Sequence, residues 1–91
     1  MANDFTRNPF FLDTEGLDLY TGRVFIRTIT ARNRTAGTLT MRMQDANGLE
    51  IFNAEVPGAS QIDRTVDGWV DGLEIAVGSL AANTEFLIYI N

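Results

Sequence analysis

The chain has 91 residues, 45% of them hydrophobic, with seven arginines, no lysine, twelve carboxylates and a formal charge of −5. A chain of this length supports one hydrophobic core, and its net negative charge argues against nucleic acid as a partner. Cysteine and histidine are both absent, which excludes disulfides, thiol nucleophiles and histidine as general base or metal ligand. We therefore expect one non-catalytic domain, without cofactor or metal, that gains stability from subunit association.

The first 22 residues are polar and rich in turn formers, and their beginning lacks the basic start and apolar stretch of a signal peptide. No apolar run approaches the roughly 18 residues that cross a bilayer, so we expect cytoplasmic synthesis and no membrane contact. Residues 1–22 predict an extended N-terminal arm. Because neighbouring side chains of an extended chain point to opposite sides, Phe10 and Phe11 cannot both face the domain. Either one anchors the arm and the other contacts a partner, or the pair packs on the protein's own surface.

Strand patterns follow at short intervals. Residues 23–32 are rich in β-branched and aromatic side chains, and residues 38–44 alternate between hydrophobic and polar. Asn47 with Gly48 predicts a hairpin turn, after which a strand should return through residues 49–56. The sequence therefore predicts three antiparallel strands in this part of the chain.

The next segment is predicted in pieces. Residues 61–66 alternate weakly, Trp69 and Val70 lie between two Asp-Gly pairs that we expect to form turns, and residues 73–77 alternate again. The last strand, residues 84–91, is hydrophobic on both faces. The core can cover one face, so a neighbouring subunit is expected to cover the other. The whole predicts an all-β fold, an antiparallel β-sandwich or jelly-roll-like barrel of six to seven strands over residues 23–91.

Sites for chemistry are not indicated. The acidic residues around Asp45 and from Asp63 to Asp71 lack the layout of a calcium-binding EF-hand loop, and we favour turn formation for both groups, with calcium binding as the minor alternative. Paired acids could hydrolyse glycosides, but so small a domain lacks a long loop to build a substrate cleft. The serines have no histidine to activate them. We predict no catalytic, cofactor-binding or metal-binding residue.

Two motifs allow a second interpretation. The sequence from Asn33 to Thr35 matches a glycosylation site, but without a secretory signal we expect a turn. Trp69 could stack on a sugar, as exposed aromatic rings do in carbohydrate-binding modules. We favour a core position, because a lone tryptophan among valine and leucine normally packs inside a small domain.

The order of features is familiar. A polar arm is followed by strands that close on the run from Asp67 to Ile75, a Gly78-Ser79 turn, an Asn83-Thr84 turn and a terminal strand from Phe86 to Ile90. This pattern, over residues of about 20 to 91, resembles the small all-β structural proteins of tailed bacteriophages, particularly capsid decoration (cement) proteins.

The resemblance implies a β-sandwich or jelly roll that forms a homo-oligomer, with a trimer favoured over a dimer. It implies a protein made in the host bacterial cytoplasm that binds the major capsid protein on the capsid exterior and stabilises the virion. The alternative is a carbohydrate-binding module, or a structural component of a fibre or tail. The candidate partner contacts are hydrophobic residues of the arm and the last strand: Phe10, Phe11, Leu12, Phe86, Ile88 and Tyr89.

Overall fold

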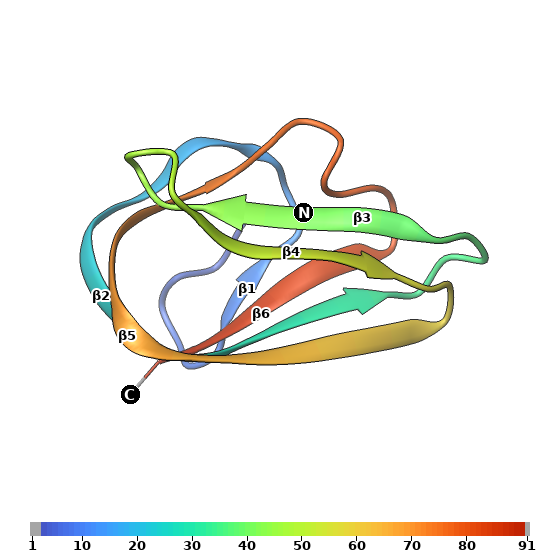
Figure 1. Ribbon diagram of the computed structural model, residues 1–91, viewed down its shortest axis with the longest axis horizontal. Coiled ribbons are helices and arrows are strands. Elements are labelled where there is room, and N and C mark those ends of the chain that lie inside the picture. The colour runs from blue at the N-terminus through green and yellow to red at the C-terminus, as the bar shows by residue number, and fades with distance from the viewer. Residues whose placement is uncertain (1–2, 91) are drawn as a thin grey trace.

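The computed structural model describes residues 3–90, apart from the side chains of Leu17 and Asp18. These residues form β1 (Phe10–Leu12), β2 (Gly16–Asn33), β3 (Leu39–Gln44), β4 (Glu50–Val56), β5 (Ser60–Ile75) and β6 (Thr84–Ile90). All six strands belong to one antiparallel sheet in the order β1-β6-β2-β5-β3-β4 (Figure 1). The prediction of an all-β fold is confirmed. In the described part of the chain, no helix is long and apolar enough to cross a membrane.

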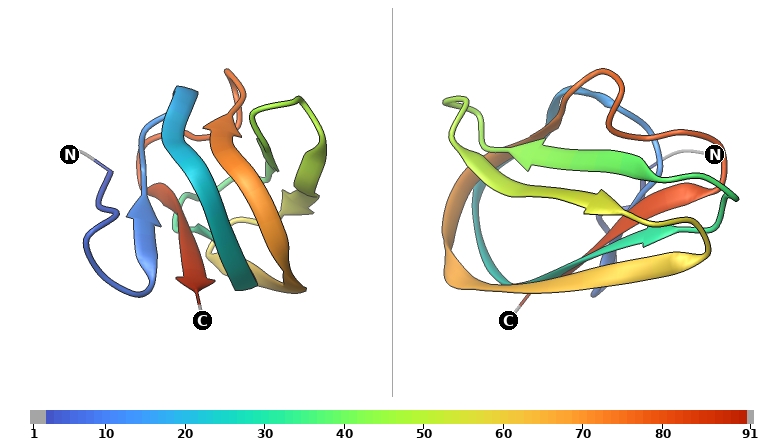
Figure 2. Two further views of the ribbon diagram at one scale, coloured as in Figure 1. Left: turned by 90° about the vertical axis from the view of Figure 1, so that its left-hand side faces the viewer. Right: turned by 45° about the vertical axis from the view of Figure 1, so that its right-hand side comes forward.

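The sheet folds over on itself. β2 and β5 bend together, so that β1 and β6 lie on one side and the β3–β4 hairpin on the other (Figure 2). Phe52 of β4 meets Phe86 of β6 across the interior, with ring centroids 5.5 Å apart. The buried core lies between these two layers. Its other large members include Ile26, Ile29, Met41, Met43, Leu73, Ile75 and Ile88.

Breaks in the β2–β5 register coincide with the bend. Opposite Arg27, β5 carries one residue more than β2, and Asp67 at this place has a φ of 51°. Opposite Gly72 the extra residue lies on β2, at Gly22, which has a φ of 106°. β-Bulges of this kind bend a strand and increase its local twist. The two Asp-Gly pairs therefore lie inside one bent strand, and the turns predicted there do not form.

The bounds of β3, β4 and β6 agree with the ranges predicted from the sequence. β3 and β4 fall inside the predicted ranges 38–44 and 49–56, and β6 covers the predicted terminal strand except for residue 91, which lies outside the described residues. β2 begins earlier than predicted, at Gly16. The predicted boundary between residues 22 and 23 therefore falls within a strand.

Much of the segment from residue 3 to 22 is part of the sheet, as β1 and the first part of β2. β1 pairs with β6, and the backbone of Asp4 exchanges two hydrogen bonds with that of Phe11. The ring of Phe10 contacts the rings of Phe5 and Tyr20 at centroid distances of 5.2 and 5.4 Å. Phe10 thus anchors this segment, as one of the two alternatives for the adjacent phenylalanines predicts. Residues 1 and 2 of the predicted arm lie outside the described residues.

Candidate interaction surface

The predicted partner contacts divide between the two faces of the sheet. Four point into the core, with exposed fractions of 3% for Phe10 and 0% for the others, and a partner cannot reach them while the fold is intact. Phe11 is half-buried and Tyr89 is 40% exposed, so these two remain accessible. The four buried residues are Phe10, Leu12, Phe86 and Ile88.

The two accessible residues lie on one face. Successive side chains of a strand point to opposite faces, and Phe11 lies between two buried residues on β1. Its register partner on β6 is Leu87, two residues before Tyr89. We call Phe11, Leu87 and Tyr89 the outer patch. It lies on the outer face of the sheet, over the edge strand β1 and its neighbour β6.

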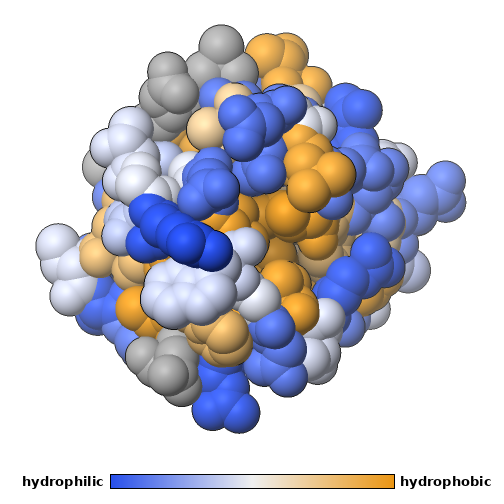
Figure 3. All heavy atoms as spheres, turned by 60° about the vertical axis from the view of Figure 1, so that its left-hand side comes forward, coloured by the Kyte–Doolittle hydropathy of each residue, from blue (hydrophilic) through white to orange (hydrophobic). Residues whose placement is uncertain are grey.

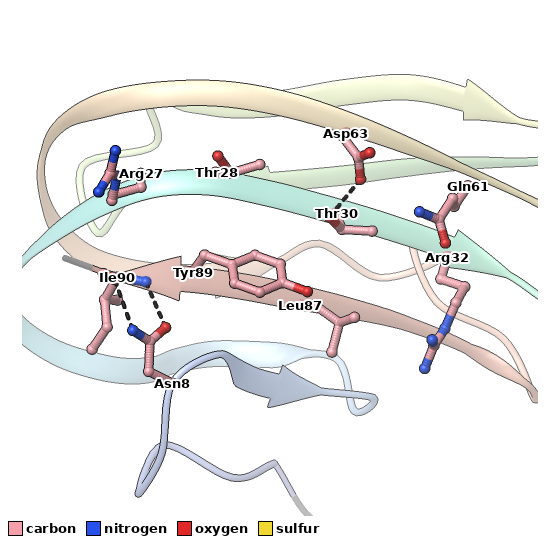
Figure 4. Close-up of a pocket in the computed structure, with 10 residues that line it drawn as sticks. All are labelled: Asn8, Arg27, Thr28, Thr30, Arg32, Gln61, Asp63, Leu87, Tyr89 and Ile90. Carbon is pink, nitrogen blue, oxygen red and sulfur yellow. Dashed lines mark hydrogen bonds between the residues drawn. The ribbon is translucent and has the colours of Figure 1, made fainter.

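Beside the outer patch the surface is hollowed, with a volume of about 640 Å³ (Figure 4). Tyr89 lies along β6 at its floor, while polar side chains of β2 and β5 form the opposite side. Thr30 donates a hydrogen bond of 2.6 Å to Asp63. Within residues 3–90, Arg27 makes no ion pair. The hollow therefore offers both donors and acceptors next to an apolar surface.

The side chain of Asn8 completes the edge of the sheet beyond β1. Its Nδ2 donates to the carbonyl oxygen of Ile90 at 2.9 Å, and its Oδ1 accepts from the amide of Ile90 at 3.0 Å (Figure 4). A residue of a neighbouring strand would make the same pair of bonds. The N-terminal segment thus covers the backbone of β6 to its end, which blunts an exposed edge.

A buried carboxylate fixes one end of the hollow. Glu85 is 1% exposed and accepts hydrogen bonds from Arg32 Nε and, at 2.9 Å, from Arg34 Nη2. Both arginines keep one side in solvent. Burial of a carboxylate is costly unless it is paired and hydrogen-bonded. We therefore assign Glu85 a structural role, which is to hold Arg32 and Arg34 in place.

The side chains of Asn33 and Asp45 form hydrogen bonds within their own turns. The amide of Asn33 is fully buried, where it accepts from Thr35 and donates to the carbonyl oxygens of Gly37 and Val56. Asp45 accepts from two backbone amides of its own turn. Side chains of this type stabilise turns by such bonds. The turn interpretations of both motifs are confirmed.

Trp69 is not in the core, and the position favoured from the sequence is wrong. Its side chain is 60% exposed on the outside of the bend. Val70 points inward instead, while Trp69 and Asp71 share the outer face, as strand alternation requires. Figure 3 shows the side of the molecule where β2 and β5 bend, on which hydrophobic side chains lie among hydrophilic ones. Pairing Trp69 with the polar Asp71 would have revealed this from the sequence.

Phe25 and Arg23 lie against the tryptophan ring, and Asp71 lies beside Arg23. Phe25 is its register partner, and the two rings meet at 5.5 Å and 78°. The guanidinium of Arg23 lies 5.3 Å from the ring centroid, and Arg23 Nε is 3.7 Å from Asp71 Oδ1. We call Arg23, Phe25, Trp69 and Asp71 the Trp69 platform.

Comparison of the chain with protein-family models, with curated proteins and with solved structures finds no match. Function must therefore be assigned from the surface of the protein. Among residues 3–90, the most exposed aromatic side chains are Tyr89 of the outer patch, at 40%, and Trp69 of the platform, at 60%. Phe11 and Tyr89 were candidates from the sequence, whereas Arg23, Phe25 and Asp71 were missed.

Proposed function

We propose that the protein is a capsid decoration (cement) protein of a tailed bacteriophage. It binds the major capsid protein on the outside of the head and stabilises the shell without catalysis. The outer patch carries this proposal, because Tyr89 is 40% exposed and lies beside the half-buried Phe11 and Leu87 on the outer face of the sheet. Aromatic and aliphatic side chains gathered on one face are typical of protein-binding surfaces. The family resemblance implies a sandwich or jelly roll, and the bent sheet resembles these folds in having two layers around one core.

The N-terminal segment supports docking by a preformed surface. Phe10 is buried and Asn8 is bonded to Ile90, so Phe11 is presented from a fixed strand. A surface that is ordered before binding loses less conformational entropy when it binds. The segment predicted as an arm thus contributes to the interface by positioning Phe11.

Because several subunits of one oligomer bind the shell together, each single interface can be weak. We propose a homo-oligomer, with a trimer favoured over a dimer, in which each subunit presents one outer patch. Linked sites raise the effective concentration of the remaining contacts once the first has formed, so avidity exceeds the affinity of a single interface. Because the protein binds the intact shell, mass action then favours that shell over its disrupted form.

The test is cosedimentation with heads of the phage that encodes the chain. The variant Phe11→Ser with Tyr89→Ser should lose most of its binding, because two apolar contacts of the interface are removed. Leu49→Ser is the matched control, since Leu49 is exposed on a turn outside the outer patch. Circular dichroism and thermal melting must show that the variants are folded.

Light scattering should also give a mass above that of the 10.1 kDa monomer. Absence of the protein from purified virions would contradict the proposal. So would head binding by the double variant that equals binding by the wild type. Deletion of residues 1–22 cannot serve as the test, because it removes β1 and the first part of β2.

A further inference from the structure

The Trp69 platform is a second exposed feature, separate from the outer patch. Its tryptophan is held by Phe25 and Arg23, and Arg23 faces Asp71. Aromatic pairs and cation–π contacts each favour one arrangement of the ring. A large exposed ring that is already held in place loses little entropy when a ligand stacks on it. The platform is thus arranged for binding.

The bend gives the platform a hollowed surrounding. A hollow of about 480 Å³ lies over Phe25, Trp69 and Ile90, and another of about 250 Å³ lies over Thr21, Gly22 and Ala46. The two share Arg23. Volumes of a few hundred Å³ suit small ligands. Arg23 therefore stands between two depressions, with the tryptophan ring on one side of it.

The polar members of the platform have unused hydrogen-bonding capacity. The side chains of Arg23 and Asp71 are each 66% exposed, and their separation of 3.7 Å exceeds that of a hydrogen bond. Arginine offers several donors in one plane and a carboxylate offers two acceptor oxygens. Their opposite charges cancel, so the pair does not favour a charged ligand. A fitting ligand needs one flat apolar face and several hydroxyl groups around it.

We propose that the Trp69 platform binds a neutral pyranose oligosaccharide. The apolar face of one sugar ring stacks on Trp69, and hydroxyl groups of the chain accept from Arg23 and donate to Asp71. Further sugar units extend into the two hollows. This site does not rest on the proposed capsid function, because it shares no residue with the outer patch.

The surroundings of the ring disfavour other classes of ligand. Asp67 and Asp71 are exposed near Trp69 and would repel the phosphates of a nucleic acid. A protein hot spot is enclosed by other contacts that exclude water. Beside Trp69, the exposed side chains of Arg23 and Asp71 are polar instead.

The chain has a single tryptophan, so its fluorescence reports on the site directly. We would titrate the full chain with cellohexaose, laminarihexaose, xylohexaose, mannohexaose, maltohexaose and chitohexaose, and repeat the binding series by calorimetry. At least one sugar should give a saturable change. For that sugar, Trp69→Ala should weaken binding roughly tenfold or more, which corresponds to about 1.4 kcal/mol, because the stacked ring is lost. Trp69→Phe should retain part of the affinity.

Three further variants separate sugar binding from folding and from docking. Asp71→Asn keeps the shape of the side chain but loses the charged acceptor, and should weaken binding several-fold. Leu49→Ala, and the Phe11→Ser with Tyr89→Ser variant, should bind the sugar as the wild type does. The proposal is overturned if no sugar of the series binds, or if Trp69→Ala binds as well as the wild type. Loss of head attachment in Trp69→Ala, without sugar binding by the wild type, would assign the platform to a protein contact instead.

Discussion

The two halves of the β2–β5 pair differ in the regularity of their register. Residues 28–33 pair with residues 60–65 without interruption, and β6 covers the other side of β2 there. In the other half the register shifts between Gly16 and Tyr20 and again between Tyr20 and Arg23. Both halves contribute to the core, Ile29 from the regular half and Ile26 and Leu73 from the bent half, but the bent half also holds Trp69 in solvent. The bulges therefore re-aim some side chains outward while the strands still bury others in the core.

The largest expected effect contrasts a buried aromatic residue of β6, which pairs with the regular half, with the exposed tryptophan of the bent half. Phe86 is fully buried against Phe52, so Phe86→Ala should lower the free energy of unfolding by about 3–5 kcal/mol. Trp69→Ala should cost only about 1 kcal/mol, because it removes one ring pair and one cation–π contact at an exposed site. Urea denaturation measures both values. Equal losses would mean that Trp69 packs as a core residue, and would break the contrast between the two regions.

The regular parts of the fold were predictable from local patterns. Alternation in residues 38–44 and the Asn47-Gly48 turn predict β3 and the hairpin, and these form. The two hydrophobic faces of the last strand predict an uncovered side, and Tyr89 is exposed there. In each case the information lies within a few neighbouring residues, so the sequence pattern was sufficient.

The bent half was not predictable in the same way. Residues with positive φ serve equally in turns and in bulges, and only the partner strand decides between them. Asp67 and Gly72 have such angles. β5 nevertheless continues through both residues, because it pairs with β2 before and after each of them. Similarly, Phe10 is buried because it pairs with Ile88, and no local pattern shows a contact so distant in sequence. The Trp69 platform was missed because it needs the register of both strands.

A substitution at Gly72 sharpens the account of the bend. Gly72 has a φ of 81°, and a Cβ there would lie 2.8 Å from the Cβ of Ala46 and 3.1 Å from the oxygen of Tyr20. Gly48 has a similar φ of 83° with open space around it. We expect Gly48→Ala to cost about 1 kcal/mol from backbone strain alone, and Gly72→Ala about 2–3 kcal/mol because the clash adds to the strain. Urea denaturation of the two variants gives the difference. Equal costs would show that no close approach holds the bend.

The smallest expected effect concerns the edge beside the regular half. Asp4 accepts hydrogen bonds from Thr6 Oγ1 at 2.6 Å and from Thr6 N at 2.9 Å, and Arg7 lies 3.3 Å away. The side-chain bond from Thr6, then its backbone bond, hold the pKa of Asp4 below the ordinary value of 3.8, and the charge of Arg7 acts in the same direction. Each of these contacts favours the charged carboxylate over the protonated form.

Because the pKa is lower in the folded chain, the stabilisation by Asp4 is complete above the ordinary value and is lost as the pH falls through the folded pKa. Below that pH the bond from the Phe11 amide to the Asp4 carbonyl should loosen first, while the amide of Ile29 stays protected. Carbon NMR of the Asp4 carboxyl and amide hydrogen exchange follow the two events. Thr6→Val should raise the pKa of Asp4, since it removes the first of the two Thr6 bonds. Titration of the wild-type group at or above 3.8 would mean that this turn does not help to hold β1 on β6.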